Sequence, residues 1–146
     1  MKAAYIERIT RFIEWPEIET IKDTTVFTIG IVGDNDFYSV LKSSLLDKSV
    51  KGKKVEIIYF VKAVKIEVCD ICYISGINET ELEILIIEAN RNGVFLMTEK
   101  KGFGDKGVHL NFYLEDNKLK FEINRSSIES GRFKVSSLLM KSARIL

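Results

Sequence analysis

The spacing of apolar side chains along the chain switches between helical and strand periods. Apolar residues recur three and four positions apart over residues 2–14, with charged residues between them, and Pro16 follows Trp15. This pattern predicts an amphipathic helix that ends before the proline. A nearly unbroken run of β-branched and aromatic residues covers positions 24–32, which predicts a strand that is buried on both faces.

Strands and helices are predicted to alternate through the rest of the chain. The turn at residues 33–36 ends in a good N-cap residue, Asp36, and apolar positions follow it at helical intervals. Asn78 and Glu81 have the spacing of a capping box, and Gly93 is placed to end that helix. Further strands are predicted at residues 54–60, 71–75 and 94–98, a hairpin at 108–114 and 119–123, and helical turns near 126 and 136.

This order of elements predicts an α/β fold. We expect a mixed β-sheet of about six strands with helices on its faces, in a Rossmann-like three-layer arrangement. The length of 146 residues lies in the usual range of one domain. No linker, repeat or low-complexity segment divides the chain, so a single domain over residues 1–146 is expected.

Charge and hydropathy indicate which classes of partner the chain is not expected to bind. Lys and Arg number 22 and Asp and Glu 21, without a basic face that would neutralise phosphates, so nucleic acid is not an expected partner. No apolar run approaches the roughly 18 residues of a membrane span, so direct membrane insertion is not expected either. The opening MKAAYIERI lacks the apolar core of a signal peptide, which indicates either a cytoplasmic protein or one whose export signal has been removed.

The chain has a single histidine, His109, which disfavours most zinc sites and His-dependent catalytic triads. By strand alternation His109 shares a face with Asn111, and the hairpin partner adds Glu122 and Asn124 to it. This polar face is either a ligand-binding site or a solvated or inter-element face. No metal site is expected.

The turn Gly33-Asp34-Asn35-Asp36 is a second ligand-binding candidate. It follows a strand, at the edge where open α/β sheets bind ligands, and precedes the free N–H groups of a helix. It lacks the G-x-G-x-x-G fingerprint and carries two carboxylates that would repel phosphate, so a capping turn is the competing interpretation and no nucleotide cofactor is expected.

Cys69 and Cys72 form a CxxC pair, and Cys72 begins a predicted strand. In an extended segment these residues are about 10 Å apart, too far for a disulfide. We expect two buried or partly buried thiols, because a local bridge would need a turn at Asp70.

Aromatic residues mark the end of the first helix. Trp15 and Pro16 follow Phe12, and an indole at a helix terminus either fills the core or anchors a partner. Phe12, Trp15 and Pro16, together with the terminal helix, are therefore the candidate partner-binding surface.

Several segments, taken in order, carry a family resemblance. They are KAAYIERITRFIEWP at the start, then IGIVGDNDF, CDICYI, GVHLNFYLEDNKLKFEIN and the closing SSLLMKSAR. This ordered set resembles the YfiR-like family of bacterial periplasmic proteins and covers essentially the whole chain.

The resemblance implies a non-enzymatic periplasmic signalling regulator, without cofactors, whose precursor carries an export signal. Family members repress a membrane-bound diguanylate cyclase in cyclic-di-GMP signalling, and a homodimer is expected by the same resemblance. The alternative is a small-molecule-sensing extracytoplasmic domain of a larger signalling protein such as a sensor kinase. Family disulfides report on redox state, whereas here Cys69 has only Cys72 to pair with.

Overall fold

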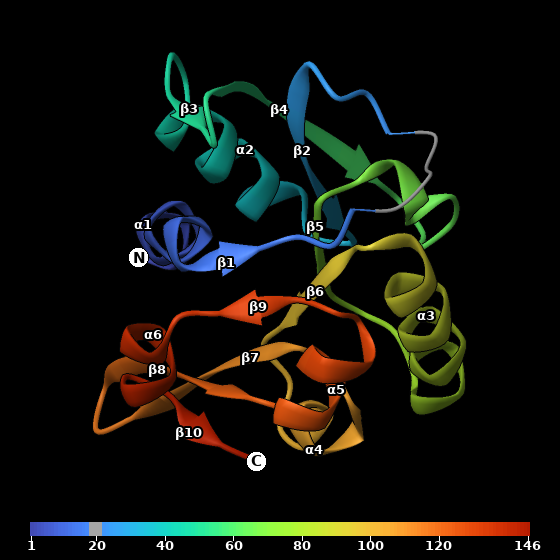
Figure 1. Cartoon of the computed structure of the whole chain (residues 1–146), viewed down its shortest axis with the longest axis vertical. Coiled ribbons are helices and arrows are strands. Elements are labelled where there is room, and N and C mark those ends of the chain that lie inside the picture. Colours follow the sequence, from blue (N-terminus) through green and yellow to red (C-terminus); the bar gives the residue numbers. More distant parts are fainter. Residues whose placement is uncertain (18–21) are drawn as a thin grey trace.

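An eight-stranded mixed sheet runs through the computed structural model, which describes residues 1–17 and 22–146 (Figure 1). The strand order is β10-β8-β7-β6-β5-β2-β4-β3, and the neighbours from β4 to β7 are parallel. The strands are β2 Val26–Val32, β3 Ser49–Val50, β4 Lys53–Phe60, β5 Ile71–Ile74, β6 Phe95–Thr98, β7 Leu110–Glu115, β8 Lys118–Ile123 and β10 Arg144–Ile145. The predicted mixed α/β sheet is confirmed, with eight strands instead of about six.

Helices cover both faces of the sheet, which gives the predicted three layers (Figure 1). One apolar cluster joins α1 (Lys2–Ile9) and α2 (Asn35–Ser44) to one face, and a second joins α3 (Glu79–Asn92) to the other. β2 supplies both clusters, because its alternate side chains point to opposite faces. The shorter helices are α4 Phe103–Lys106, α5 Arg125–Ser130 and α6 Ser137–Lys141, with 3₁₀ turns η1 Thr10–Phe12 and η2 Ile66–Val68.

The predicted ends of α3 are confirmed, and the predicted cap of α2 is wrong. The capping box of Asn78 and Glu81 is present, and Gly93 ends α3 at φ +64°. The cap of α2 was assigned wrongly, because the side chain of Asp34, not Asp36, accepts from the Phe37 N–H at 2.9 Å. A capping side chain accepts from the N–H two or three residues after it, and Phe37 stands three residues after Asp34 but only one after Asp36.

The first helix is shorter than its apolar spacing predicts. α1 ends at Ile9, η1 follows, and β1 (Ile13–Glu14) pairs antiparallel with β9 (Lys134–Val135) in a separate two-stranded sheet. The Thr10 hydroxyl donates to the Glu7 carbonyl at 2.6 Å, a back-bond that competes with continued helix. This change of direction carries the chain from α1 across the face of the main sheet.

Trp15 fixes that crossing segment to the sheet. Its indole N–H donates to the Asp70 carbonyl oxygen at 2.8 Å, and its ring lies edge-on to Phe27 and Phe133, with centroids 5.2 and 6.2 Å away. Asp70 also accepts the Thr28 N–H on its carboxylate at 2.9 Å. Burial raises the pKa of the Asp70 carboxyl, which this N–H partly offsets. The half-buried side chain of Trp15 therefore packs against the core.

Replacing Trp15 should destabilise the protein strongly. We expect Trp15→Ala to cost about 3–5 kcal/mol of unfolding free energy, since it removes a large ring from an aromatic cluster. Trp15→Phe should cost roughly 1–2 kcal/mol, because it keeps a ring but leaves the Asp70 carbonyl without this donor. Urea unfolding measures both, with the exposed Val40→Ala as control. Equal stability of Trp15→Ala and the control would contradict the packing of Trp15 against the core.

Candidate functional site

An apolar groove of about 390 Å³ lies between α1 and α6. Leu138 and Leu139 are consecutive in α6, so Leu139 turns into the core while Leu138 is 63% exposed. The Ser136 hydroxyl caps this helix at the Leu138 N–H, 3.2 Å away, and so fixes where the exposed leucine stands. The apolar lining comes from Tyr5, Ile9, Phe12, Phe121, Leu138 and Leu139.

The three residues predicted to bind a partner have different surroundings. Phe12 is half-buried and lines the groove. Trp15 packs against Phe27 and Phe133, and Pro16 is half-buried beside it in the sequence, outside the lining of the groove. Partner binding stays a prediction, and the groove centres it on Phe12 and α6.

The Gly33–Asp36 turn lies at the carboxyl end of β2, as predicted. Gly33 has φ +75°, and a Cβ there would stand 2.7 Å from the Ser75 carbonyl oxygen. The turns that follow β2 and β5 therefore touch backbone to backbone, and Asp34 is engaged as the cap of α2. Asn35 and Asp36 are exposed in the first turn of that helix.

The start of α1 covers this edge of the sheet. The Lys2 ammonium donates to the Tyr73 hydroxyl at 2.9 Å and to Glu99 at 2.6 Å. It also lies 4.9 Å from the ring centroids of Phe37 and Tyr73. Burial lowers the pKa of Lys2, but the hydrogen bonds with Glu99 and Tyr73 outweigh it and leave the pKa raised. The ammonium group of Lys2 thus lies at the carboxyl ends of the strands, where open α/β sheets usually bind a ligand.

His109 lies inside the protein and not on an open face. Its Nδ1 accepts the Leu96 N–H at 2.9 Å, so the proton is on Nε2, which donates to the Asn90 side-chain oxygen 2.6 Å away. The ring stacks on Phe95 with centroids 5.1 Å apart. Burial lowers the pKa of His109 to about 3, so the ring is neutral at physiological pH.

The other polar residues of the hairpin join neighbouring elements. Asn111 accepts the Thr98 hydroxyl at 2.7 Å and donates to Glu122 at 2.9 Å, and Asn111 and Glu122 are directly paired across β7 and β8. Asn124 caps α5 and donates to the Gly104 carbonyl at 2.8 Å. Asn111 and Glu122 share one face, as alternation predicts, and α4 packs against that face at Gly104, which alternation could not show.

A polar hollow of about 710 Å³ opens beside this hairpin. Asn111 and Glu122 line it, together with Tyr113 and Arg144. Glu122 is only 4% exposed, and the Arg144 guanidinium binds it while lying 4.4 Å from the Tyr113 ring centroid. The ligand-binding interpretation stays a prediction, and Asn111 and Glu122 are its best-placed members.

Sequence reasoning missed Arg144 and Asp70. Arg144 stands in β10, the two-residue strand that pairs with β8 opposite Glu122. Asp70 forms hydrogen bonds with three segments of the chain. They are the segment after β1 through Trp15, β2 through Thr28 and β6 through Phe95. The available signal was a lone carboxylate between two cysteines in an apolar run, which indicates a buried acceptor.

Cys69 and Cys72 are both buried as free thiols. A Cβ on Gly30 would lie 2.6 Å from the Cys69 sulfur, so a glycine in β2 makes room for that thiol. Hydrogen bonding to Cys69 and burial raise the pKa of Cys72, which keeps it protonated. Neither thiol is placed as a reactive nucleophile.

Within residues 1–17 and 22–146, no three or more His, Cys, Asp or Glu side chains gather as they would around a metal ion. None of the helices in those ranges has the length and apolar character needed to cross a membrane.

Acid should destabilise the protein through His109. The unfolded chain binds a proton near pH 6.5 and the folded chain only near 3, so the stabilisation is complete above pH 6.5 and falls as the pH falls. At pH 5 the loss should be about 2 kcal/mol. The Asp70 carboxyl affects stability in the opposite direction. Because its pKa is raised in the folded protein, its protonation at low pH favours the folded state.

Urea unfolding of the wild type and His109→Gln at pH 5 and pH 7.5 measures this effect. The glutamine amide can accept from Leu96 and donate to Asn90, but it does not titrate. The variant should lose about 2 kcal/mol less than the wild type between the two pH values. Equal losses would contradict the burial of a neutral imidazole.

Comparison with known proteins defines the relationships of the chain. A crystal structure of a conserved domain protein from Vibrio cholerae O1 biovar El Tor shares the fold, with a TM-score of 0.64 and 14% sequence identity. The match covers 98% of this chain and 59% of that one, so the chain spans about three-fifths of the Vibrio protein. No curated protein sequence matches the chain.

The family relationship covers nearly every residue described above. Residues 1–144 match the sequence family described as YfiR/HmsC-like, and this range includes the first helix, the hairpin and all of α6. Family members are known as periplasmic regulators of cyclic-di-GMP signalling. The chain belongs to the YfiR/HmsC-like family.

Proposed function

We propose that this chain is a non-enzymatic periplasmic regulator that controls a membrane-bound diguanylate cyclase by direct contact through the groove between α1 and α6. The observation that carries the proposal is the exposed Leu138 beside the half-buried Phe12, in an apolar hollow on the surface. The only histidine supports a non-catalytic role, because both of its ring nitrogens are engaged inside the core.

The groove has the chemistry of a protein-binding hot spot. A hollow of about 390 Å³ accommodates a few apolar side chains, and Arg8 and Ser142 supply polar groups at its margin. Filling it would remove Leu138 and Phe12 from water, and each fully buried side chain of this size contributes about 1.5–3 kcal/mol. An apolar helix or loop of the cyclase is the segment that fits it.

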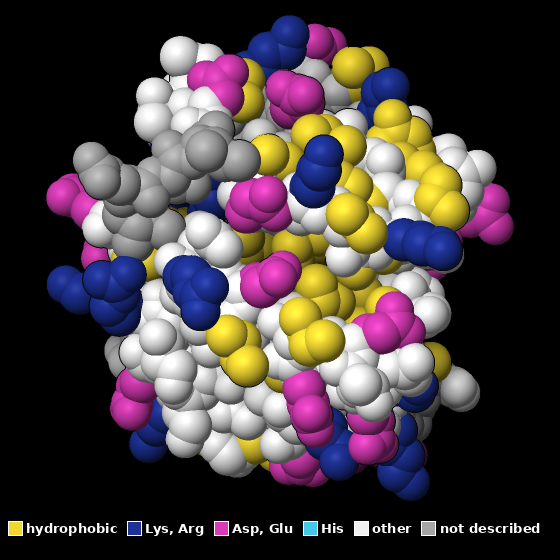
Figure 2. Space-filling model, turned by 90° about the vertical axis from the view of Figure 1, so that its right-hand side faces the viewer, with side chains coloured by type: hydrophobic (Ala, Val, Ile, Leu, Met, Phe, Trp, Pro, Cys, Tyr) yellow, Lys and Arg dark blue, Asp and Glu magenta, His cyan; other side chains and the backbone are white. Residues whose placement is uncertain are grey.

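A second apolar surface provides a matched control. Ile84 and Ile87 of α3 are 57% and 60% exposed, and Figure 2 shows apolar side chains gathered on the face of the molecule that carries this helix. Acidic and basic residues stand among them. An aspartate at Ile84 therefore adds the same charge at similar exposure, away from the groove.

Leu138→Asp should abolish control of the cyclase, and Ile84→Asp should not. A carboxylate buried against an apolar partner should weaken binding by roughly 3 kcal/mol, on the order of 100-fold in Kd. The readouts are cyclic-di-GMP in cells that carry only the variant and co-purification with the cyclase. Equal repression by both variants, with both shown to be folded, would contradict the placement of the interface.

A small-molecule sensor is the second candidate function, as an extracytoplasmic domain of a larger signalling protein such as a sensor kinase. The observation that favours it is the polar hollow of Asn111, Glu122 and Arg144. A thermal-shift screen of amino acids, nucleotides and other metabolites tests it. A ligand of this hollow should raise the melting temperature of the wild type and not of Arg144→Ala, and the absence of any stabilising compound would remove this candidate.

A further inference from the structure

The outer edge of β4 is only partly covered by another strand. β3 pairs with the first two residues of β4, and within residues 1–17 and 22–146 no strand pairs with the rest of that edge. Lys48, which directly precedes β3, lines a hollow together with Val55. A further strand therefore has room beside residues 56–60. An open edge of this kind is a ready template for another strand.

The backbone groups that point outward from this part of β4 belong to Ile57 and Tyr59. The Gly33 N–H donates to the Phe60 carbonyl at 3.0 Å, so the backbone groups of Phe60 point toward β2. Because backbone groups alternate in direction along a strand, those of Ile57 and Tyr59 point away from β2. Each of these two residues thus offers one donor and one acceptor at the spacing of a neighbouring strand.

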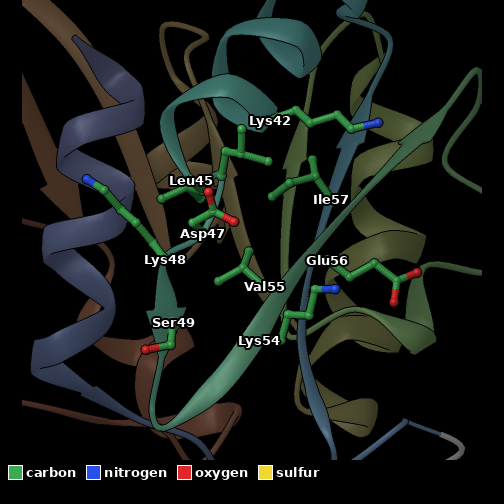
Figure 3. A pocket seen from close by; sticks show the side chains of 10 residues that line it. Lys42, Leu45, Asp47, Lys48, Ser49, Lys54, Val55, Glu56 and Ile57 are labelled. Carbon is green, nitrogen blue, oxygen red and sulfur yellow. The ribbon is translucent and has the colours of Figure 1, made fainter.

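An apolar surface continues from this edge. A hollow of about 630 Å³ lies between β4 and the end of α2, and Figure 3 shows Leu45 and Ile57 on two sides of it. Tyr59 is on the same face of β4 as Ile57, and its ring lies beside that of Tyr38 in α2, with centroids 5.7 Å apart. Every second side chain of an added strand would therefore lie against apolar groups.

Positive charge exceeds negative charge at the margin of the hollow. Lys42, Lys48 and Lys54 line it together with Asp47 and Glu56. In the part of the chain that the structure describes, none of these three lysines forms an ion pair. Carboxylates on an incoming segment would meet these ammonium groups, which favours an acidic partner at this edge.

We propose that residues 56–60 of β4 bind an extended acidic segment of another protein, which adds to the sheet as an antiparallel strand. The segment has apolar residues opposite Ile57 and Tyr59 and carboxylates at its ends. Antiparallel is the direction of β3 on the same edge, and it lets each outward residue form both of its hydrogen bonds with one partner residue.

This surface is separate from the groove between α1 and α6, because the two share no lining residue. The inference therefore goes beyond the proposed control of a cyclase and does not depend on it.

Hydrogen exchange of the whole chain, measured by NMR with a designed peptide, tests the proposal. The probe is the capped peptide Asp-Thr-Ile-Thr-Ile-Thr-Asp, at millimolar concentration. The amides of Ile57 and Tyr59 should exchange about tenfold more slowly with the peptide than without it. The Ile58 amide points toward β2 and should change little. Unchanged exchange at Ile57 and Tyr59 overturns the proposal.

N-methylated peptides test the strand pairing itself. In the antiparallel arrangement both isoleucine amides of the peptide donate to β4, and the amide of its central threonine points away. N-methylation of either isoleucine should therefore abolish the protection of Ile57 and Tyr59, and N-methylation of the central threonine should leave it. Equal effects of the two modifications would show that the peptide binds without adding a strand, which overturns the proposal.

Charge reversal tests the preference for an acidic segment. Lys48→Glu should raise the Kd of the peptide about fivefold or more, because it replaces attraction by repulsion at the end of the edge. Lys101→Glu, in an exposed turn beside the β7–β8 hairpin, is the matched control and should leave the Kd unchanged. Both lysines are exposed, so both variants should fold. Equal Kd values for the two variants overturn the acidic assignment.

The same measurement without peptide tests the competing occupant. Protection of the Ile57 and Tyr59 amides that grows with the concentration of the chain alone would assign the edge to a second copy and overturn the proposal. Fast exchange of both amides at every concentration of the free chain is the expected result.

Discussion

The hydrogen bond from the Trp15 indole to the Asp70 carbonyl oxygen holds together the parts of the structure that matter for function. Asp70 precedes β5, and its backbone and carboxylate also bind residues of β2 and β6. Trp15 belongs to the segment that crosses the sheet after α1 and pairs with β9 through β1. One aromatic anchor therefore ties the amino-terminal segment to the sheet and sets where α1 lies.

Two features of the surface follow from that placement of α1. Its first turn brings Lys2 over the carboxyl ends of the strands, between Tyr73 and Glu99, where a ligand would enter a related open sheet. Its last turn brings Ile9 beside α6, and η1 directly after it brings Phe12 there, which makes the apolar groove. The same helix closes the usual ligand edge of the fold and supplies one wall of the proposed partner site.

Much of the fold could be predicted from local chemistry. The buried strand β2, the capping box of α3 and the hairpin register each follow from a pattern confined to one element. The elements that were predicted wrongly or not at all depend on contacts between residues far apart in the sequence. α1 stops early because the chain turns to pair with β9, and β10 exists because Arg144 reaches Glu122 across the chain.

The site was harder to predict than the fold. Alternation assigned His109 and Asn111 to one polar face, but His109 precedes β7, and its ring packs on Phe95 and Phe133 and binds Asn90. Their place at the end of the first predicted helix marked Phe12 and Trp15 alike, and only the packed structure shows that Phe12 lines the groove while Trp15 packs on Phe27 and Phe133. Such distinctions depend on tertiary contacts, which periodicity does not encode.

The proposed regulatory contact places Leu138 of α6 against a membrane-bound cyclase. Site-specific photo-cross-linking from this position in living cells tests it most directly, with the probe at Ile84 for comparison. An adduct between the chain and the periplasmic part of a diguanylate cyclase is expected from position 138, and none from position 84. An adduct with that cyclase from position 84 and none from position 138 would contradict it.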